Sequence, residues 1–421
     1  LTVEQKEFIQ KAKEGNNILV NACIGSGKTT AIQELCKEIP KEKKILYLTY
    51  NKLLKIDAKS KIKQKNVLVT NYHGFAYMAL KGVKISVGVS DLIQTYNKRK
   101  PPISQYDILI LDEYQDINSE LSDLLLTIKD TNPNIQIIAV GDMDQKIYDF
   151  SKLNISEFIN TFLGDYIKME FTQCFRLPKE YAKDIGALWN KKITGVNKNC
   201  KIRIMSNEEI IHFLGTKKPK DILCLGARKG TLSKTLNAVE EKYPQIYNKK
   251  TVYASISDND AEKQISPSSN TAIFTTYDSS KGLERDICII FDYTEEYWES
   301  RAKATNTNSK ILKNIFLVAA SRGKKEIIFC FDGYTPLSDK TLTTKNEKNK
   351  LNNKIPFPIA EMFDFKYKED VVDCFNTIKT KEIKQNSHEV IEIQSHDELI
   401  DLSPCIGAYQ EAIYFNKHSI N

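Results

Sequence analysis

The sequence lacks any long apolar run. No stretch approaches the roughly 20 consecutive apolar residues that a membrane-spanning helix requires. The first residues, LTVEQK, also lack the apolar region of a secretory signal peptide. These two absences predict a cytoplasmic protein without a membrane partner.

The chain has no organised set of cysteines either. Its nine cysteines are scattered, odd in number and without a Cys-x-x-Cys pair. This pattern favours neither a disulfide framework nor a metal cluster. Cys224, Cys288 and Cys330 lie in apolar segments, which predicts buried free thiols in a reducing compartment.

No extreme of charge or composition is present. The 421 residues include 61 basic and 54 acidic side chains, a formal net charge of +7, with 41% hydrophobic and 27% charged residues. This length allows two or three domains, each with its own core. The modest basic excess is compatible with nucleic-acid binding without demanding it.

The most informative stretch is a glycine-rich loop, ACIGSGKT at residues 22–29, which follows the apolar residues 18–20. Glycines let several backbone N–H groups face one anion, and a following helix N-terminus adds partial positive charge. In such a loop Lys28 reaches the β and γ phosphates and Thr29 holds Mg²⁺. Ala22 stands where the usual pattern has glycine, and an ordinary turn between strand and helix is the structural alternative.

Short apolar runs alternate with helix-like segments across the first third of the chain. Such runs predict an α/β fold with a parallel sheet buried on both faces. Ligands bind beyond the carboxyl ends of the strands in such sheets, and the polar motifs of this chain follow those ends. The predicted strands are residues 18–20, 45–48, 67–69, 108–111 and 135–140.

Two of these strand ends carry residues suited to nucleotide hydrolysis. Asp112 and Glu113 follow one strand; one carboxylate can hold Mg²⁺ through water while its neighbour polarises the attacking water. Helix capping is the alternative role for such acidic residues. Gln145 follows the next strand and is placed to sense the γ-phosphate. The nearby Tyr148 and Phe150 would face a base or, alternatively, pack in the core.

The motifs, in order, resemble those of superfamily 1 helicases of the UvrD/Rep type, in which alanine at the first loop position is usual. Gln5 resembles the Q motif, and residues 22–29, 112–116 (DEYQD) and 141–148 (GDMDQKIY) resemble motifs I, II and III. Motifs IV, V and VI are matched by FTQCFR at 171–176, TYDSSKGLE at 276–284 and VAASRG at 318–323. The motif style is nearest to phage UvrD-like proteins and F-box DNA helicases.

Three departures from the family pattern carry information. Asp278 replaces a usual histidine in motif V, and Thr30 stands where an arginine often follows motif I. Cys174 and Phe175 replace a common Asn-Tyr pair. Phe175 keeps the ring, so we expect it to hold adenine on one face by itself.

The resemblance implies ATP and Mg²⁺ as cofactors and assigns roles to individual residues. Implied catalytic residues are Lys28, Glu113, Gln145, Arg176 and Arg322. Implied ATP-binding residues are Gln5, Ala22, Gly25, Ser26, Gly27, Lys28, Thr29, Thr30, Phe175, Gly282 and Glu284. Thr29 and Asp112 would hold the metal. Contacts to single-stranded DNA are expected from Tyr50, Asn51, His73, Phe75, Tyr148, Phe150 and Ser279, although capping of a turn is an equal alternative for His73.

The resemblance also implies two RecA-like domains, residues 1–165 and 166–335, with the nucleotide between them. A polar linker (336–354) and a C-terminal extension of unknown role (355–421) follow. Only residues 78–106 remain for the insertion called 1B, and no room is left for a full 2B insertion, so we expect a compact motor.

The leading functional hypothesis is a 3′ to 5′ DNA helicase or single-stranded DNA translocase driven by ATP hydrolysis, in DNA repair or antiviral defence. The main alternative is an ATP-gated DNA-binding subunit that regulates a separate nuclease or other effector, bound through the C-terminal extension. An RNA helicase is less favoured. A nuclease within the extension is disfavoured, because residues 389–394 lack the lysine that such a site requires.

Overall fold

The computed structural model describes residues 1–50, 52–147, 153–256, 270–293, 297–298, 301 and 309–330. Within it the chain divides into two compact units, Leu1–Phe175 and Arg176–Asn421. The predicted linker and C-terminal extension lie outside the described residues.

The first unit is an alternation of helices and parallel strands, as its sequence pattern predicts. Each of the five predicted strands is present, because each is a short, β-branched run that can be buried on both faces. The elements are α1 (Val3–Lys13), β1 (Ile18–Ala22), α2 (Lys28–Glu38), β2 (Ile45–Thr49), α3 (Lys52–Lys61), β3 (Val67–Asn71), α4 (Tyr72–Gly82), α5 (Leu92–Arg99), β4 (Ile108–Asp112), α6 (Ser119–Thr131), β5 (Gln136–Gly141), α7 (Ile155–Leu163) and β6 (Ile167–Phe171).

These strands form one six-stranded sheet in the order β3-β2-β4-β5-β1-β6, and every neighbouring pair is parallel. The strand that leads into the glycine-rich loop, β1, is separated by β5 from β4, which leads to the acidic pair. This is the RecA-like arrangement. It places the polar motifs that follow β1, β4 and β5 at one edge of the sheet.

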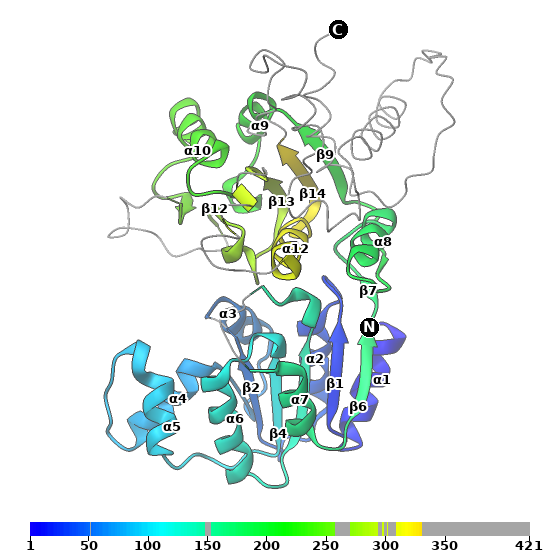
Figure 1. The fold of residues 1–421 in the computed structure, drawn as a ribbon, viewed down its shortest axis with the longest axis vertical. Helices are drawn as coiled ribbons and strands as arrows, with labels where there is room; N and C mark the ends of the chain where they lie inside the picture. The colour runs from blue at the N-terminus through cyan, green and yellow to red at the C-terminus, as the bar shows by residue number, and fades with distance from the viewer. Residues whose placement is uncertain are drawn as a thin grey trace, which may run out of the picture. The chain divides into compact units, whose positions relative to one another are not determined.

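Helices cover both faces of this sheet (Figure 1). Side chains of α1, α2 and α3 pack into one core, and those of α4, α5, α6 and α7 pack into the other. The short α4–α5 hairpin occupies the region predicted to be a reduced 1B insertion.

The end of the first unit differs from the predicted boundary at 165/166. β6 lies beyond that boundary, yet it pairs in parallel with β1 and therefore belongs to the first sheet. The unit extends to Phe175. β6 forms the edge of the sheet, and its sequence alternates apolar and polar residues, Ile-Lys-Met-Glu-Phe, so it lacks the continuous apolar pattern that marks the inner strands.

The second unit contains a second six-stranded parallel sheet, in the order β11-β12-β10-β13-β14-β9. α9 and α10 pack on one face, and the carbonyl of Ala319 at the end of α12 meets the Cys288 thiol on the other. Its elements are α8 (Lys179–Leu188), β9 (Lys201–Met205), α9 (Asn207–Leu214), β10 (Ile222–Gly226), α10 (Thr231–Lys242), β11 (Val252–Ala254), β12 (Ala272–Thr276), β13 (Arg285–Ile290), α12 (Ser309–Ala319) and β14 (Gly323–Cys330).

The structure also bears on the cysteines and on membrane insertion. All seven cysteines in the described residues are free and buried, which confirms the prediction of buried thiols for these positions. Burial raises the pKa of the Cys36 thiol to about 12, so this thiol stays protonated and unreactive. Among the helices of the described residues, none is long and apolar enough to cross a membrane.

Candidate nucleotide site and nucleic-acid interface

The glycine-rich loop joins β1 to α2, and its shape depends on two glycines. Gly25 and Gly27 adopt positive φ angles of 62° and 76°, which side chains with a Cβ rarely tolerate. A Cβ added at Gly27 would lie 3.0 Å from the Gln5 amide nitrogen. Glycine is therefore required at Gly27 by conformation and by space, and α2 begins directly after it at Lys28.

Gln5 holds this loop in place. Its side-chain carbonyl accepts from the Thr2 N–H in a capping box at the start of α1, and its amide donates to the Ser26 carbonyl at 2.9 Å. The Ser26 hydroxyl is buried and makes no hydrogen bond with any described residue. The structure thus brings Gln5 and the loop together.

Phe175 lies against the same loop. Its N–H donates to the Gly25 carbonyl at 2.9 Å, and its ring passes within 3.7 Å of a Cβ built at Gly27. The side chain is 46% exposed. An aromatic ring held at this loop with its surface accessible suits stacking on a base, as the sequence predicts for adenine.

Lys28 forms an ion pair with Glu113 across the site. Lys28 Nζ lies 3.0 Å from Glu113 Oε1, and both side chains are largely buried. Burial lowers the pKa of Lys28, but the carboxylates of Glu113 and Asp112 more than offset this and raise it overall. Glu113 has a positive φ of 58°, which turns the chain sharply after β4.

Asp112 is held at one oxygen and open at the other. The Tyr47 hydroxyl of β2 donates to Asp112 Oδ2 at 2.8 Å, while the buried Oδ1 has no hydrogen-bond partner among the described residues. Burial, and next the charge of Glu113, raises the pKa of Asp112 to about 6. An unpartnered carboxylate oxygen near the first turn of α2, where Thr29 lies, fits the oxygen ligands that Mg²⁺ prefers.

Gln115 connects the loop after β4 to the loop after β5. Its amide donates to the Glu113 carboxylate, and its carbonyl accepts from the Asp142 N–H at 2.9 Å. A Cβ at Gly141 would overlap this carbonyl. Gln145 completes the chain of contacts by donating to Asp142 Oδ2 at 2.9 Å. The residue predicted to sense phosphate is therefore linked to Glu113 through Asp142, by its carboxylate and its backbone N–H, and then through the Gln115 side chain.

Sequence reasoning missed the structural roles of Gln115 and Tyr47. Gln115 stands inside motif II, so its position was visible, but only the fold shows its second contact at Asp142. Tyr47 carries no motif signal, because it looks like any aromatic residue of a buried strand. Burial and the Asp112 carboxylate raise its pKa well above the usual range, so its hydroxyl remains a donor.

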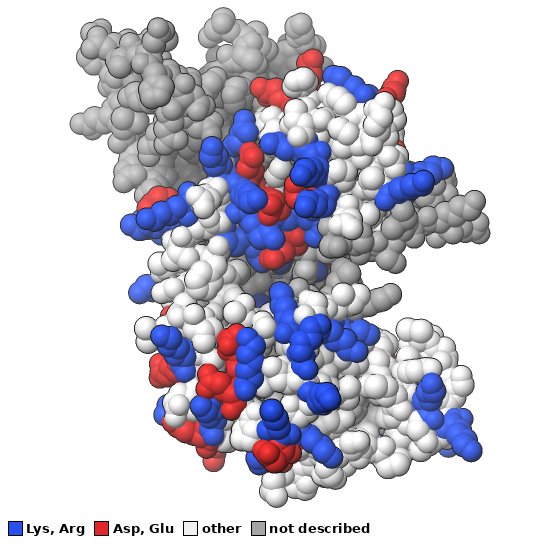
Figure 2. All heavy atoms as spheres, turned by 180° about the vertical axis from the view of Figure 1, so that it is seen from behind, with Lys and Arg blue, Asp and Glu red and all other residues white. Residues whose placement is uncertain are grey.

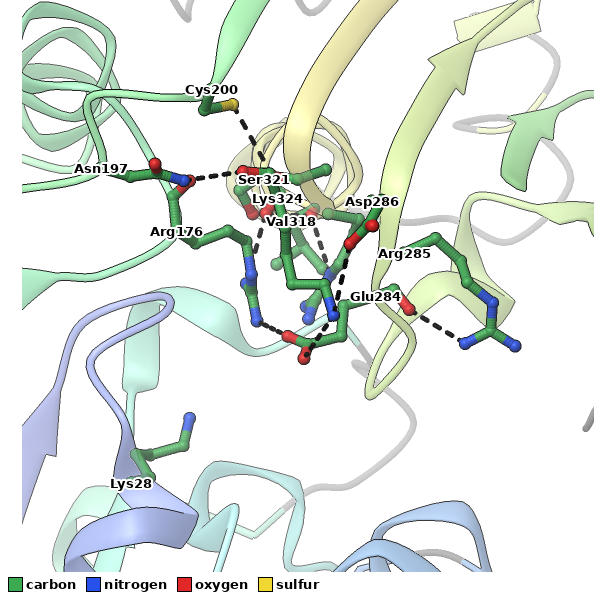
Figure 3. Close-up of polar contacts among 12 residues, drawn as sticks. Lys28, Arg176, Asn197, Cys200, Glu284, Arg285, Asp286, Val318, Ser321 and Lys324 are labelled. Carbon is green, nitrogen blue, oxygen red and sulfur yellow. Dashed lines mark hydrogen bonds and ion pairs between the residues drawn. The ribbon is translucent and has the colours of Figure 1, made fainter. Parts of the chain in front are cut away.

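In the second unit, the motif IV, V and VI residues form a separate charged cluster (Figure 3). The Arg176 guanidinium donates to the Glu284 carboxylate and, at 3.2 Å, to the Ser321 carbonyl. Lys324 Nζ lies 3.8 Å from the other oxygen of Glu284. Arg176, and to a smaller extent Lys324, hold the pKa of Glu284 at about 2.

Two further predicted residues lie in this second unit. Arg322 is largely buried, and its Nε donates to the Val318 carbonyl at 3.0 Å. Gly282 adopts a φ of 80°, which turns the chain just before Glu284. The structure thus brings Arg176 and Glu284 into contact. Arg322 directly follows Ser321, whose carbonyl accepts a hydrogen bond from Arg176.

The predicted nucleic-acid contacts have mixed outcomes. Phe75 was expected at the surface, but it is 3% exposed and packs 5.9 Å from the Tyr96 ring; its role is in the core, because α5 covers it. His73 and Ser279 are exposed, and Tyr50 is partly buried. Asn51, Tyr148 and Phe150 lie outside the described residues.

Comparison with known proteins finds relatives of the first unit. Residues 5–151 match a family model described as an AAA domain. A stretch of 81 residues is 41% identical to F-box DNA helicase protein 1 of Schizosaccharomyces pombe, covering 19% of this chain and 9% of that protein. Residues 5–151 are thus similar to an AAA domain, and part of the chain is similar to a DNA helicase. The chain therefore matches only a small part of this curated relative.

Solved helicases are similar to this chain at a lower level. The DUF1998 helicase MrfA bound to DNA is 12% identical with a TM-score of 0.43, covering 85% of this chain and 52% of that one. A structure of two coordinating Pif1 helicases at forked double-stranded DNA is 14% identical with a TM-score of 0.41, covering 84% of this chain and 96% of that one.

Proposed function

We propose that the chain is an ATP-dependent motor that moves 3′ to 5′ along single-stranded DNA and separates duplexes. The observation that carries this proposal is the arrangement in the first unit, where Lys28 and Glu113 form an ion pair beside an Asp112 oxygen without a partner. A cation, a carboxylate for water and an open metal-binding oxygen are the groups that hydrolysis of a nucleoside triphosphate requires.

The residues of the first unit act in sequence. Lys28 leaves Glu113 to bind the phosphates, so Glu113 becomes available to accept a proton from the attacking water. Thr29 and Asp112 would hold Mg²⁺, which would neutralise charge on the phosphates. Gln115 keeps Glu113 in position, and Phe175 stacks on the base.

The resemblance to superfamily 1 helicases implies that two arginines add positive charge during turnover. Arg176 and Arg322 are the candidates, and such arginines accelerate phosphoryl transfer by about 10³ to 10⁵. Arg176 is bound to Glu284 in this structure, so it must exchange a carboxylate for a phosphate to act. Ser279 and His73 contribute to the path of the nucleic acid.

The first experiment is ATP hydrolysis by the full chain with and without oligodeoxythymidylate. We expect DNA to stimulate turnover, and Lys28→Ala or Glu113→Gln to abolish it. Lys37→Ala is the matched control, since Lys37 lies on the same helix and pairs with Glu34 at the surface. ATP hydrolysis that does not respond to DNA, or that persists in both variants, would reject the motor function.

A second experiment tests direction and unwinding. Duplexes with a 3′ or a 5′ single-stranded tail, compared at equal length, should be separated only when the tail is 3′. ATP-dependent DNA binding without strand separation would instead favour a regulatory subunit of a nuclease or other effector. Competition by single-stranded RNA equal to that by DNA would favour an RNA substrate.

A further inference from the structure

The outer face of α4 carries an exposed stripe of aromatic and basic side chains. α4 begins directly after β3, at the edge of the sheet where ligand sites of parallel sheets lie. Tyr72, Phe75, Ala76 and Leu80 of this helix are buried. His73, Tyr77 and Lys81 are exposed, and their spacing of four residues places them on one face. We call these three residues the α4 stripe.

Tyr77 and Lys81 contact each other within this stripe. The Lys81 ammonium lies 5.9 Å from the centre of the Tyr77 ring, and Tyr77 is 50% exposed. The half-exposed ring is therefore accessible to a ligand. A ring beside a cation is a platform for a base and its neighbouring phosphate.

The charge of the surrounding hairpin supports a polyanionic partner. Residues 72–106 contain five basic residues and one acidic residue, Asp91. The basic side chains, all exposed, are Lys81, Lys84, Lys98, Arg99 and Lys100. Figure 2 shows blue side chains on an otherwise white surface at the lower right, the side of the first unit that carries α4 and α5.

The same hairpin exposes apolar side chains, so a protein partner has to be weighed. Tyr77, Met78, Val83 and Val89 are all exposed large hydrophobic residues. An apolar protein interface would exclude charge from its centre, whereas here Lys81 lies beside the exposed ring. The juxtaposition of ring and cation favours nucleic acid.

We propose that the α4 stripe binds single-stranded nucleic acid, with Tyr77 stacking on a base and Lys81 contacting the adjacent phosphate. The stripe spans about 12 Å from His73 to Lys81 at the helical rise of about 1.5 Å per residue. It extends the path that begins at His73 onto the hairpin. This inference rests on the proposed motor function, which requires a nucleic-acid strand to pass the edge of the sheet where α4 begins.

The test is the binding of a fluorescent oligodeoxythymidylate to the full chain, measured by anisotropy without nucleotide at several salt concentrations. Tyr77→Ala should weaken binding by about 5- to 150-fold, as loss of one stacked base does. Tyr77→Phe keeps the ring and should bind like wild type. Lys81→Gln should reduce the slope of log affinity against log salt by about 0.7, and Lys81→Arg should restore it.

Lys65→Gln is the matched control. Lys65 is an exposed lysine just before β3, at the opposite end of the strand from α4, so its loss should leave both affinity and salt slope unchanged. Wild-type affinity and slope in Tyr77→Ala and Lys81→Gln would overturn this inference while leaving DNA-stimulated hydrolysis intact. A wild-type chain that neither binds the oligonucleotide nor responds to it in hydrolysis would overturn the motor function as well.

Discussion

The Lys28 ammonium and the Glu113 carboxylate, 3.0 Å apart, neutralise each other in the candidate phosphate-binding site. Both groups are predicted to act on ATP, one on its phosphates and one on the attacking water. Their pairing without nucleotide avoids leaving either charge buried alone, which would be costly. In the proposed mechanism, binding of the phosphates would separate this pair and free Glu113 to accept a proton from the attacking water.

Lys28→Met should lower the free energy of unfolding by about 3 kcal/mol, because it removes the positive charge beside the largely buried Glu113 carboxylate. Adding Glu113→Gln should recover most of this loss. Urea unfolding of both single variants and the double variant measures the coupling. Lys37→Met, which breaks an exposed pair with Glu34, should cost less than about 1 kcal/mol. Simple additivity of the two site substitutions would contradict the pairing.

Asp112→Asn should stabilise the protein at pH 8 without Mg²⁺. The folded-state pKa of Asp112 is raised to about 6 from 3.8, so the native state binds its proton more tightly and stability falls as pH rises through this interval. Removing the charge should raise the free energy of unfolding by on the order of 2 kcal/mol at pH 8 and leave it unchanged below pH 4. Thermal melting across pH checks this.

The same variant should lose the Mg²⁺-dependent gain in melting temperature that ATP confers on wild type, since the open Asp112 oxygen becomes part of an amide. A variant that is no more stable at pH 8 would show that burial does not disfavour the Asp112 charge. Retention of the Mg²⁺-dependent gain would place the metal elsewhere.

Gln115→Ala should lower kcat for ATP by about tenfold while leaving KM nearly unchanged. It removes the donor to Glu113 and the acceptor for the Asp142 N–H, and positioned proton acceptors contribute about 10² to 10⁴ in rate. Gln115→Glu keeps the acceptor for the Asp142 N–H but places a second carboxylate beside Glu113. Because the new carboxyl group ionises as pH rises, the kcat of this variant should fall further as pH rises. Gln94→Ala, at an exposed position on α5, is the control. An equal rise in KM would indicate general damage to the site.

Glu284→Gln should lower the melting temperature at pH 7 but have no effect near pH 2. The Arg176 guanidinium depresses the pKa of Glu284 to about 2 from 4.5. Its stabilisation is therefore complete above about pH 4.5 and lost as pH falls through 2. The carboxylate is half exposed, so the gain is about 1 kcal/mol or less and should shrink in 1 M salt. A difference that persists at pH 2 would rule out the ion pair as its source.

The sequence predicted the inner strands and the phosphate loop because their signals are local. Runs such as residues 108–111 are apolar at every position. The glycines of the loop are needed because the local turn requires positive φ angles. β6 was not predicted as a strand of the first sheet, because an edge strand alternates apolar and polar residues. Phe75 was assigned to the surface because its motif does not indicate that α5, a later helix, packs over it.

The sequence by itself indicated which residues are candidates for binding phosphate, metal and base, since their chemistry and order along the chain resemble those of superfamily 1 helicases. Only the tertiary structure decided how they are held. Tyr47 reaches Asp112 and Gln115 reaches Asp142 because parallel pairing brings the ends of β2, β4 and β5 to one edge of the sheet. Contacts between residues so distant in sequence arise from strand order, which local patterns do not encode.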